Sequence, residues 1–394
     1  MGVRARRHVE KSQLEDHRNV RPRFRQALRH TASAGLILLL AGCALFKPED
    51  KFGAREASFS DLPGWQEENH AEALGVFLVS CETQAKKPEV RAKTSGIAIT
   101  QGVWRSLCAE AVSAQGNPQA ARAFFERRFI PFRINNNGRE EGLFTGYYEP
   151  LLYGSPHRHG DFRYPVYALP PDIREGTPYL SRDEIERGAL SGRGLELMWV
   201  DDPVMLFFLQ IQGSGRVRFM DGREMRVGYA GKNNHPYVAL GKIMREEKLL
   251  PEDGIHFFSI RQWLYMNREQ AFPMMARNPS YVFFRLVEGA GPIGSVGVPL
   301  TPYRSLAVDS RYIPYGLPLF LETELAGEPQ RPPMPFSRLM VAQDTGGAIR
   351  GPVRGDIFFG AGDTAEYYAG YMKSKGRYNL LVPREVAAQL RTDG

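Results

Sequence analysis

The sequence predicts a mainly β fold with some helix (α+β), in which helices near the start precede a small β barrel near the end. The 40 glycines and 28 prolines favour a turn-rich fold that contains strands over a helical bundle. Apolar residues make up 43% of the chain, with 23 Phe and 17 Tyr among them, which is ample for a buried core. At 394 residues, one large or two medium domains are expected.

The beginning of the chain has the pattern of an export signal. Residues 1–42 hold nine basic and three acidic side chains, so they account for +6 of the net charge of +7. The remainder is nearly neutral, so the basic pI gives no argument for a nucleic-acid partner. An apolar run at 34–41 is too short to span a bilayer but suits the core of a signal peptide.

Cys43 lies directly after this run, at the end of a Leu-Ala-Gly-Cys tetrapeptide. The tetrapeptide is similar to a bacterial lipobox, which predicts that residues 1–43 are a lipoprotein signal and that Cys43 carries the lipid. An ordinary anchor helix is the alternative. Ala44 rather than Asp follows the cysteine, which is typical of lipoproteins of the outer membrane. We therefore expect an outer-membrane lipoprotein of a Gram-negative bacterium that faces the periplasm.

Two further cysteines, Cys81 and Cys108, leave their pairing open. In an oxidising periplasm they could form a disulfide, and as buried free thiols they would be equally consistent with the sequence. No CxxC motif or Cys/His cluster suggests a metal site. No metal and no cofactor are expected.

A polar tether and three helices are expected first. Residues 44–62 are polar and predict the tether. Apolar residues at helical spacing predict helices over 65–81 and 103–112. Asn117 and Pro118 supply an N-cap and a first-turn proline for a third helix.

The middle of the chain predicts strands and a few capped helices. Apolar runs at 195–200 and 203–210 predict strands, and the two glycines within 210–219 predict a strand–turn–strand unit. Capping-box patterns predict helix starts at Ser181 and Ser259.

Residues 143–150, with the sequence LFTGYYEP, predict a strand that runs into an exposed bend. Thr145, Tyr147 and Tyr148 there combine hydroxyl groups with flat aromatic faces, which suits a groove for sugars. An ordinary strand with half-buried tyrosines is the alternative.

Short strands joined by Gly/Pro turns predict a small barrel from residue 300 onward. They are expected at 304–308, 317–323, 337–342, 357–359 and 378–382. Asp309, Asp344 and Asp356 each fall where an apolar strand meets a turn, so all three could converge at one end of the barrel. Each could instead simply cap a turn or a helix.

Convergent carboxylates would give this region its chemistry. Like charges resist sharing a site, so each carboxylate raises the pKa of the others, and one of them can stay protonated near neutral pH as a general acid. The segment 343–362 holds six glycines, which allow its backbone to come close to a ligand. No activated Ser, Cys or metal motif accompanies these aspartates.

Six motifs carry a resemblance to a known family. They are FTGYYEP (144–150), QGSGRVRF (212–219), GYAGKNNHPY (228–237), NPSYVFF (278–284), AVDSRYIPYG (307–316) and DTGGAIRG…DIFFG (344–360). In this order, and with the lipobox, they resemble the membrane-bound lytic murein transglycosylase A family. The last two match its 3D domain, named for three aspartates.

The resemblance implies a particular architecture. A double-psi β-barrel catalytic domain with N-terminal helices would comprise residues 63–149 and 290–394. A smaller β domain would be inserted at 150–289, and the glycan would lie in the groove between the two domains.

The resemblance also implies an activity: cleavage of the β-1,4 bond between N-acetylmuramic acid and N-acetylglucosamine in peptidoglycan, which leaves 1,6-anhydromuramic acid ends. Asp356 would act as acid and then as base, and Asp344 and Asp309 match the supporting pair. One extra residue between Asp344 and Asp356 departs from the family pattern, so the path of that loop is open.

Five residues are assigned to the substrate groove: Thr145, Tyr147, Tyr148, Gln212 and Lys232. The expected partners are peptidoglycan glycan strands and the outer membrane through the lipid on Cys43, with a complex that remodels the cell wall as a further candidate. Two alternatives differ in chemistry. One is a non-catalytic outer-membrane lipoprotein that binds peptidoglycan, and the other is a hydrolase that uses water as the nucleophile.

Overall fold

The computed structural model describes residues 49–289, 291–328 and 331–391. The predicted signal peptide and the lipid site at Cys43 lie outside these residues. Residues 50–394 form one compact unit. Within the described part of that unit, no helix has the length and apolar character needed to cross a membrane.

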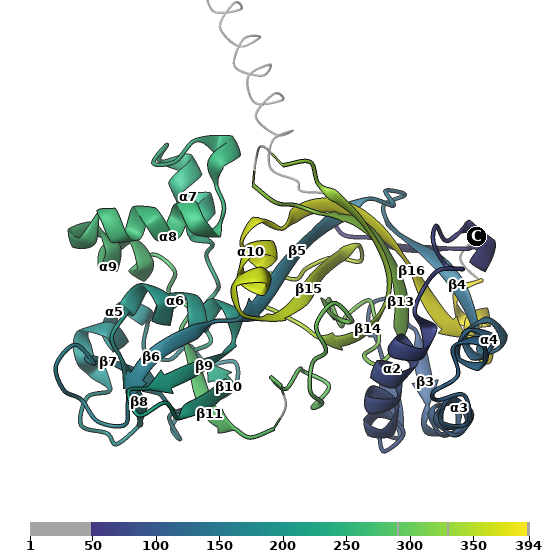
Figure 1. Cartoon of the computed structure of the whole chain (residues 1–394), viewed down its shortest axis with the longest axis horizontal. Coiled ribbons are helices and arrows are strands. Elements are labelled where there is room, and N and C mark those ends of the chain that lie inside the picture. Colours follow the sequence, from purple (N-terminus) through teal and green to yellow (C-terminus); the bar gives the residue numbers. More distant parts are fainter. Residues whose placement is uncertain (1–48, 290, 329–330, 392–394) are drawn as a thin grey trace, which may run out of the picture. The chain divides into compact units, whose positions relative to one another are not determined.

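The larger sheet closes into a six-stranded barrel (Figure 1). The order around the barrel is β16-β13-β14-β12-β15-β5, and β5 pairs back onto β16. The strands are β5 (Gly142–Glu149), β12 (Ser305–Val308), β13 (Pro318–Leu325), β14 (Met334–Asp344), β15 (Arg354–Ala361) and β16 (Lys373–Pro383). The mainly β α+β class with a closed barrel is thus confirmed, and all five strands predicted after residue 300 are present.

Two further strands extend the sheet beyond β16, and one of them corrects the predicted tether. β4 (Phe129–Asn136) pairs with β16, and β1 (Phe52–Glu56) pairs with β4 in antiparallel register. Part of the segment 44–62 is therefore a strand rather than a tether. Hydrogen bonding to the edge of β4 orders a polar stretch that lacks the apolar alternation of a typical strand.

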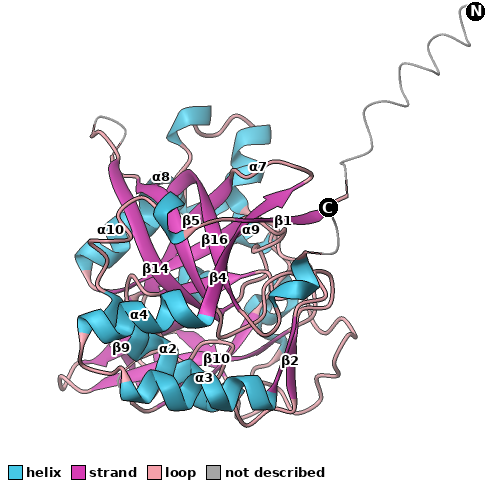
Figure 2. Cartoon of the chain, turned by 90° about the vertical axis from the view of Figure 1, so that its right-hand side faces the viewer, coloured by secondary structure: helices cyan, strands magenta, loops and turns pink. Residues whose placement is uncertain are grey.

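Three helices cover one side of the barrel, as Figure 2 shows for α2 (His70–Gln84), α3 (Gln101–Ser113) and α4 (Pro118–Arg128). Asn117 caps α4 as predicted, because its side chain accepts a hydrogen bond from the backbone N–H of Ala120. The first helix begins five residues later than expected, after the cap at Asn69. A disulfide joins Cys81 in α2 to Cys108 in α3.

A second sheet forms the inserted region, opposite α2, α3 and α4 in Figure 1. Its order is β11-β10-β9-β6-β8-β7. The strands are β6 (Leu151–Ser155), β7 (Tyr164–Tyr167), β8 (Glu196–Val200), β9 (Ser214–Phe219), β10 (Glu224–Lys232) and β11 (Val282–Val287). The chain passes from the barrel strand β5 into β6 through a single residue, Pro150, and returns to the barrel between β11 and β12.

Several helices accompany this sheet and the barrel. They are α5 (Arg182–Glu184) with a π-helical turn (Ile185–Ala189), α6 (Pro203–Gln212), α7 (Leu240–Glu246), α8 (Phe257–Met266), α9 (Arg268–Ala276) and α10 (Asp363–Tyr371). The remaining elements are the small pair β2 (Glu89–Arg91) and β3 (Ala98–Thr100) and the 3-10 turns Phe59–Asp61, Glu252–Gly254 and Ala387–Leu390. The capping box predicted at Ser181 is present at the start of α5.

The prediction of a strand at 203–210 is wrong, because this segment is helix α6. Asp202 caps the helix, Pro203 occupies its first turn, and Gly213 ends it in the left-handed conformation with φ 81°. Most of the helix is buried, so its apolar run lacks the polar face that would have revealed a helical period. The strand–turn–strand unit predicted at 210–219 is accordingly a helix end followed by β9.

The cap predicted at Ser259 is displaced by three residues. Helix α8 begins at Phe257, and His256 is its N-cap. Ser259 is the third helical residue, and its hydroxyl accepts a hydrogen bond from the backbone N–H of His256. The capping box is therefore present, but the serine is its second member rather than its first.

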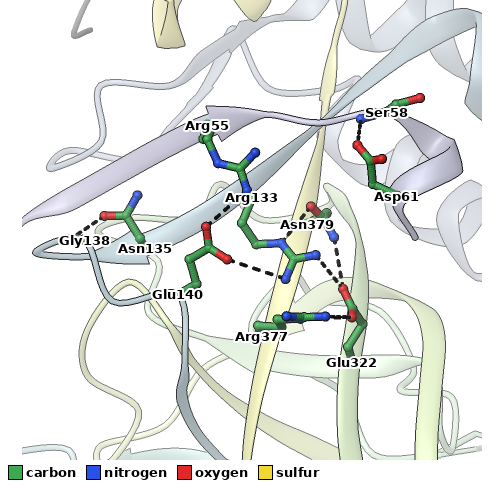
Figure 3. A network of polar contacts seen from close by, with 10 residues as sticks. All are labelled: Arg55, Ser58, Asp61, Arg133, Asn135, Gly138, Glu140, Glu322, Arg377 and Asn379. Carbon is green, nitrogen blue, oxygen red and sulfur yellow. Dashed lines mark hydrogen bonds and ion pairs between the residues drawn. The ribbon is translucent and has the colours of Figure 1, made fainter. Parts of the chain in front are cut away.

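A buried polar network ties three strands together on the barrel (Figure 3). Arg133 on β4 donates to Glu322 on β13 at 2.8 Å and to Asn379 on β16 at 3.1 Å. Arg377 on β16 donates to the other oxygen of Glu322. Because each buried charge has an opposite charge beside it, the network holds the strands in register without an isolated buried ion.

Candidate active site

Asp344 and Asp356 lie in one row across neighbouring strands of the barrel. Ala307 on β12 pairs with Asp344 on β14 at one side and with Asp356 on β15 at the other. Asp356 pairs in turn with Thr145 on β5. Side chains of paired residues stand on the same face of a sheet, so both carboxyl groups flank the small methyl group of Ala307. Asp356 is therefore inside a strand and not at its end, which corrects the sequence prediction.

A two-step chain of hydrogen bonds fixes one oxygen of Asp356. The Thr145 hydroxyl donates to Asp356 Oδ1 at 2.6 Å, and Arg354 Nη2 donates to the Thr145 oxygen at 2.8 Å. A guanidinium group only donates, so the Thr145 oxygen accepts from Arg354 while its single proton is given to Asp356. Within the described residues, Asp356 Oδ2 accepts no hydrogen bond.

The surroundings of Asp356 favour its protonated form. Burial raises the pKa of Asp356 to about 6, although the positive charge of Arg354 and the hydrogen bond from Thr145 oppose the rise. The negative charge of Asp344 adds to it. A carboxyl group with this pKa is partly protonated near neutral pH, as a general acid must be.

Asp344 is held more tightly than Asp356. Its Oδ1 accepts hydrogen bonds from the backbone N–H of Ser295 at 3.0 Å and from the Ser295 hydroxyl at 2.7 Å. Its Oδ2 accepts one from the Tyr147 hydroxyl at 2.9 Å. Burial raises the pKa of Asp344 above its usual value in spite of these donors. Both of its oxygens are thus occupied by protein groups.

Asp309 has hydrogen-bond donors of its own, different from those of the other two aspartates. It is 1% exposed and accepts hydrogen bonds from the Arg311 guanidinium, at 2.6 Å to Oδ2, and from the backbone N–H of Gly351, at 2.8 Å. Burial raises its pKa, but these donors outweigh burial, so the pKa of Asp309 is lowered overall. Of the other two aspartates, Asp344 is the one whose charge acts on the pKa of Asp356. The contact with Gly351 anchors the loop between β14 and β15.

A cleft of about 590 Å³ opens beside the two paired aspartates. On the barrel side it is lined by Tyr147, Asp344, Asp356 and the loop 345–350, in which Gly346 and Gly347 leave room for a ligand. The inserted sheet and its loops form the facing wall. That wall includes Gln212, Tyr229, Lys232, Tyr237 and Arg285.

Three of the five predicted groove residues line the cleft and two do not. Tyr147, Gln212 and Lys232 line the cleft, and Thr145 reaches it through Asp356. Tyr148 is buried elsewhere, packs edge-on against Phe257 and lines a second, smaller cavity.

Sequence reasoning missed several residues of the cleft. Tyr229 and Tyr237 line the cleft and expose 50% and 37% of their surface. Both belong to the GYAGKNNHPY motif, where a tyrosine beside a glycine (Tyr229) and a tyrosine after a proline (Tyr237) were the available signal. Arg354 was also missed, although it lies two residues before Asp356 on one strand and therefore on the same face.

Two family models match the chain. The model described as "MltA specific insert domain" matches residues 143–285, and the "3D domain" model matches residues 304–382. The first covers most of the inserted region together with β5, and the second covers β12 to β16.

Two curated relatives carry the name "Membrane-bound lytic murein transglycosylase A". The Escherichia coli K12 protein is 30% identical over 349 residues, which are 88% of this chain and 93% of the relative. The Vibrio cholerae protein is 36% identical over 244 residues, which are 60% of this chain and 64% of the relative. The alignment with the latter thus spans just under two thirds of its length.

Solved structures are similar over most of the chain. The crystal structure of a membrane-bound lytic murein transglycosylase from Agrobacterium tumefaciens aligns with a TM-score of 0.78 and 35% identity, and covers 86% of this chain and 100% of that one. E. coli MltA with bound chitohexaose aligns with a TM-score of 0.64 and 27% identity, and covers 85% and 92% of the two chains.

Proposed function

Since the chain belongs to the membrane-bound lytic murein transglycosylase A family, we propose that it cleaves peptidoglycan with Asp356 as acid and then as base. The bond cut is the β-1,4 bond between N-acetylmuramic acid and N-acetylglucosamine. The observation that supports this most is the state of Asp356. Its pKa is raised to about 6, one oxygen is held by Thr145, and the carboxyl group lines the cleft.

In the proposed reaction Asp356 passes one proton out and takes one back. Its carboxyl group protonates the glycosidic oxygen, so the bond to C1 of the muramic acid breaks and N-acetylglucosamine leaves with a free hydroxyl. The carboxylate then accepts the proton of the muramic C6 hydroxyl, whose oxygen attacks C1. The product is a 1,6-anhydro ring, and Asp356 is protonated again.

One free carboxyl group suffices because the nucleophile belongs to the substrate. Ordinary glycosidases use a second carboxylate as nucleophile or as base. Asp344 is poorly suited to that role, since Ser295 and Tyr147 occupy both of its oxygens. We assign Asp344 the supporting role of raising the pKa of Asp356, and Asp309 the role of anchoring the loop through Gly351.

The hydrogen-bond chain to Asp356 also selects which oxygen carries the proton. The Thr145 hydroxyl donates to Oδ1, and its oxygen accepts a hydrogen bond from Arg354. A proton on Asp356 is therefore favoured on Oδ2, the oxygen without a protein donor. We infer that Thr145 and Arg354 are positioning residues, which present the acidic proton from Oδ2 to the glycosidic oxygen.

In this proposal the two walls of the cleft have different roles. The barrel domain (63–149 and 290–394) supplies the acid, and the inserted domain (150–289) supplies much of the binding surface. Tyr229 and Tyr237 offer faces on which sugar rings can stack, while Gln212 and Lys232 offer polar contacts. Tyr148 would act only indirectly, because its backbone N–H donates to the Gln212 side chain.

The names of the relatives indicate membrane association. We propose that a lipid on Cys43 attaches the protein to the outer membrane, with the catalytic unit in the periplasm. The Cys81–Cys108 disulfide agrees with an oxidising compartment.

A single digest tests the activity. Purified peptidoglycan is incubated with the protein, and the soluble fragments are weighed by mass spectrometry. We expect muropeptides with 1,6-anhydro ends, which are lighter by one water than the products of hydrolysis. Products that contain the extra water would identify a hydrolase instead, and the absence of soluble fragments would favour the non-catalytic binding protein.

A further inference from the structure

The cleft contains cationic side chains that the proposed reaction does not use. Lys232 on β10 and Arg285 on β11 line the inserted wall, and Arg350 lines the loop of the barrel wall. Arg182 also lines the cleft, but it is engaged by Glu186 and by backbone carbonyl groups.

The other three cations have no carboxylate partner within 4.0 Å in the described part of the chain. Among the described residues, the Arg285 guanidinium makes one hydrogen bond, a long one from Nε to the carbonyl of Tyr229 at 3.4 Å. Arg285 and Arg350 are exposed, and Lys232 is half-buried. Their charged ends are therefore available to a ligand in the cleft.

These three cations do not set the pKa of the proposed acid. The cation that acts on the pKa of Asp356 is Arg354, on the same strand. Asp344 is held by neutral donors, Ser295 and Tyr147. The three free cations thus have neither a structural partner nor a part in the acid chemistry.

The substrate offers anions at only one kind of position. The sugar rings of the glycan are neutral. Carboxylates occur on the lactyl substituent of muramic acid, either as the free acid or along the peptide that extends it. We propose, on the basis of the function proposed above, that Lys232, Arg285 and Arg350 bind these lactyl-linked carboxylates and so make the cleft selective for charged strands over neutral chito-oligosaccharides.

The spacing along the inserted wall suits an extended anionic chain. Arg285 pairs with Gly228 across the sheet, and Lys232 pairs with Val282, three residues before Arg285, because the register shifts between Tyr229 and Gly231. Three residues of strand span roughly 10 Å. Both side chains line the cleft, and an extended peptide of about three residues spans a similar distance, so one peptide can reach both cations.

The test compares three ligands in the full-length protein. The first ligand is peptide-bearing glycan strands. The second is the same strands after an amidase has removed the peptides and left the free lactyl carboxylate. For these two, kcat/KM for the release of anhydro product is measured. Neutral chitohexaose is compared by its binding constant. The variants are Arg285→Gln, Arg350→Gln and the double variant. Arg268→Gln and Arg105→Gln are matched controls, because both arginines are exposed and neither lines the cleft.

We expect kcat/KM on peptide-bearing strands to fall about threefold in each single variant and about tenfold in the double variant, consistent with the loss of exposed ion pairs. Binding of chitohexaose should change less than twofold. If kcat/KM falls equally on stripped strands, the ligand of the cations is the lactyl carboxylate. If kcat/KM falls only on peptide-bearing strands, the ligand is the peptide. In both cases added salt should raise KM more in the wild type than in the double variant.

Two results overturn the proposal. In the first, kcat/KM on both kinds of strand and the affinity for chitohexaose fall by the same factor. In the second, kcat/KM in the cleft variants falls no more than it does in Arg268→Gln and Arg105→Gln. Failure of the underlying function looks different, because the wild type would then release no anhydro product from either kind of strand.

Discussion

Asp309 and Asp356 lie beside paired strands, yet their surroundings affect the two carboxyl groups in opposite ways. Asp309 follows β12 directly, and Asp356 lies on β15, which pairs with β12. Asp309 receives a guanidinium and two backbone N–H groups, whereas Asp356 receives a single hydroxyl. Burial raises the pKa of both groups, so the number and charge of the donors decide which group stays ionised.

The comparison has a consequence for stability. The pKa of Asp309 is lowered in the folded protein, so its ionised form stabilises the fold above the pKa of the unfolded chain, and this contribution disappears as the pH falls through the folded pKa. The pKa of Asp356 is raised to about 6, so stability is lost as the pH rises from the unfolded pKa of about 4 to about 6, and the loss levels off above that. The structural carboxylate supports the fold, while the proposed acid weakens it.

The largest expected effect is on activity at Asp356. The change Asp356→Asn keeps the shape of the side chain and removes its proton donor, so kcat should fall about 1,000-fold or more. At pH 7.5 the same variant should be more stable than the wild type by about 1–3 kcal/mol, because an unfavourable buried charge is removed. Release of anhydro product and urea denaturation measure the two effects.

Asp253→Asn provides the control, since Asp253 is exposed and lies outside the cleft. Both kcat and stability should stay at the wild-type level in this variant. Turnover by Asp356→Asn within tenfold of the wild type would remove Asp356 from the chemistry and would make Asp344 the remaining candidate.

The next effect is on stability at Asp309. Asp309→Asn weakens the charged hydrogen bonds to Arg311 and Gly351, so the free energy of unfolding at pH 7 should fall by about 2–3 kcal/mol. The difference from the wild type should shrink below about pH 4, where Asp309 becomes protonated in the unfolded chain. Urea denaturation at pH 7 and at pH 3.5 measures it.

Activity separates the two aspartates in the same experiment. At a temperature where Asp309→Asn is folded, kcat should fall far less than in Asp356→Asn. Equal losses of activity in the two variants, with the fold intact, would show that the supposed structural carboxylate takes part in the reaction.

The sequence was sufficient to predict the barrel but not to distinguish its aspartates. Short apolar runs between glycine and proline turns indicated the strands of the barrel, because each run fits one half-buried strand. Asp309, Asp344 and Asp356 looked alike, since each follows or adjoins such a run. The distinction depends on partners, and Gly351 lies 42 residues from Asp309.

The contact between Thr145 and Asp356 could not be predicted from the sequence because it depends on long-range strand pairing. Thr145 and Asp356 are 211 residues apart and meet only because β5 and β15 pair in parallel. No local pattern predicts that contact. Helix α6 was missed for a different reason, since a helix buried on most sides has no polar face to give its sequence a helical period.

The smallest expected effect is a shift in the pH profile at Arg354. Asp356 must be protonated to act as the acid, so kcat should fall as the pH rises through about 6. Arg354→Gln removes the charge that lowers the pKa of Asp356, so this alkaline limb should move up by about half to one pH unit. The value of kcat at its optimum should fall less than tenfold.

Arg354→Lys keeps the charge but not the planar fork that reaches Thr145, so the alkaline limb of its pH profile should stay near that of the wild type. An unmoved limb in Arg354→Gln would reduce Arg354 to a structural residue. The number of donors at Asp356 would then set its pKa without help from the neighbouring charge.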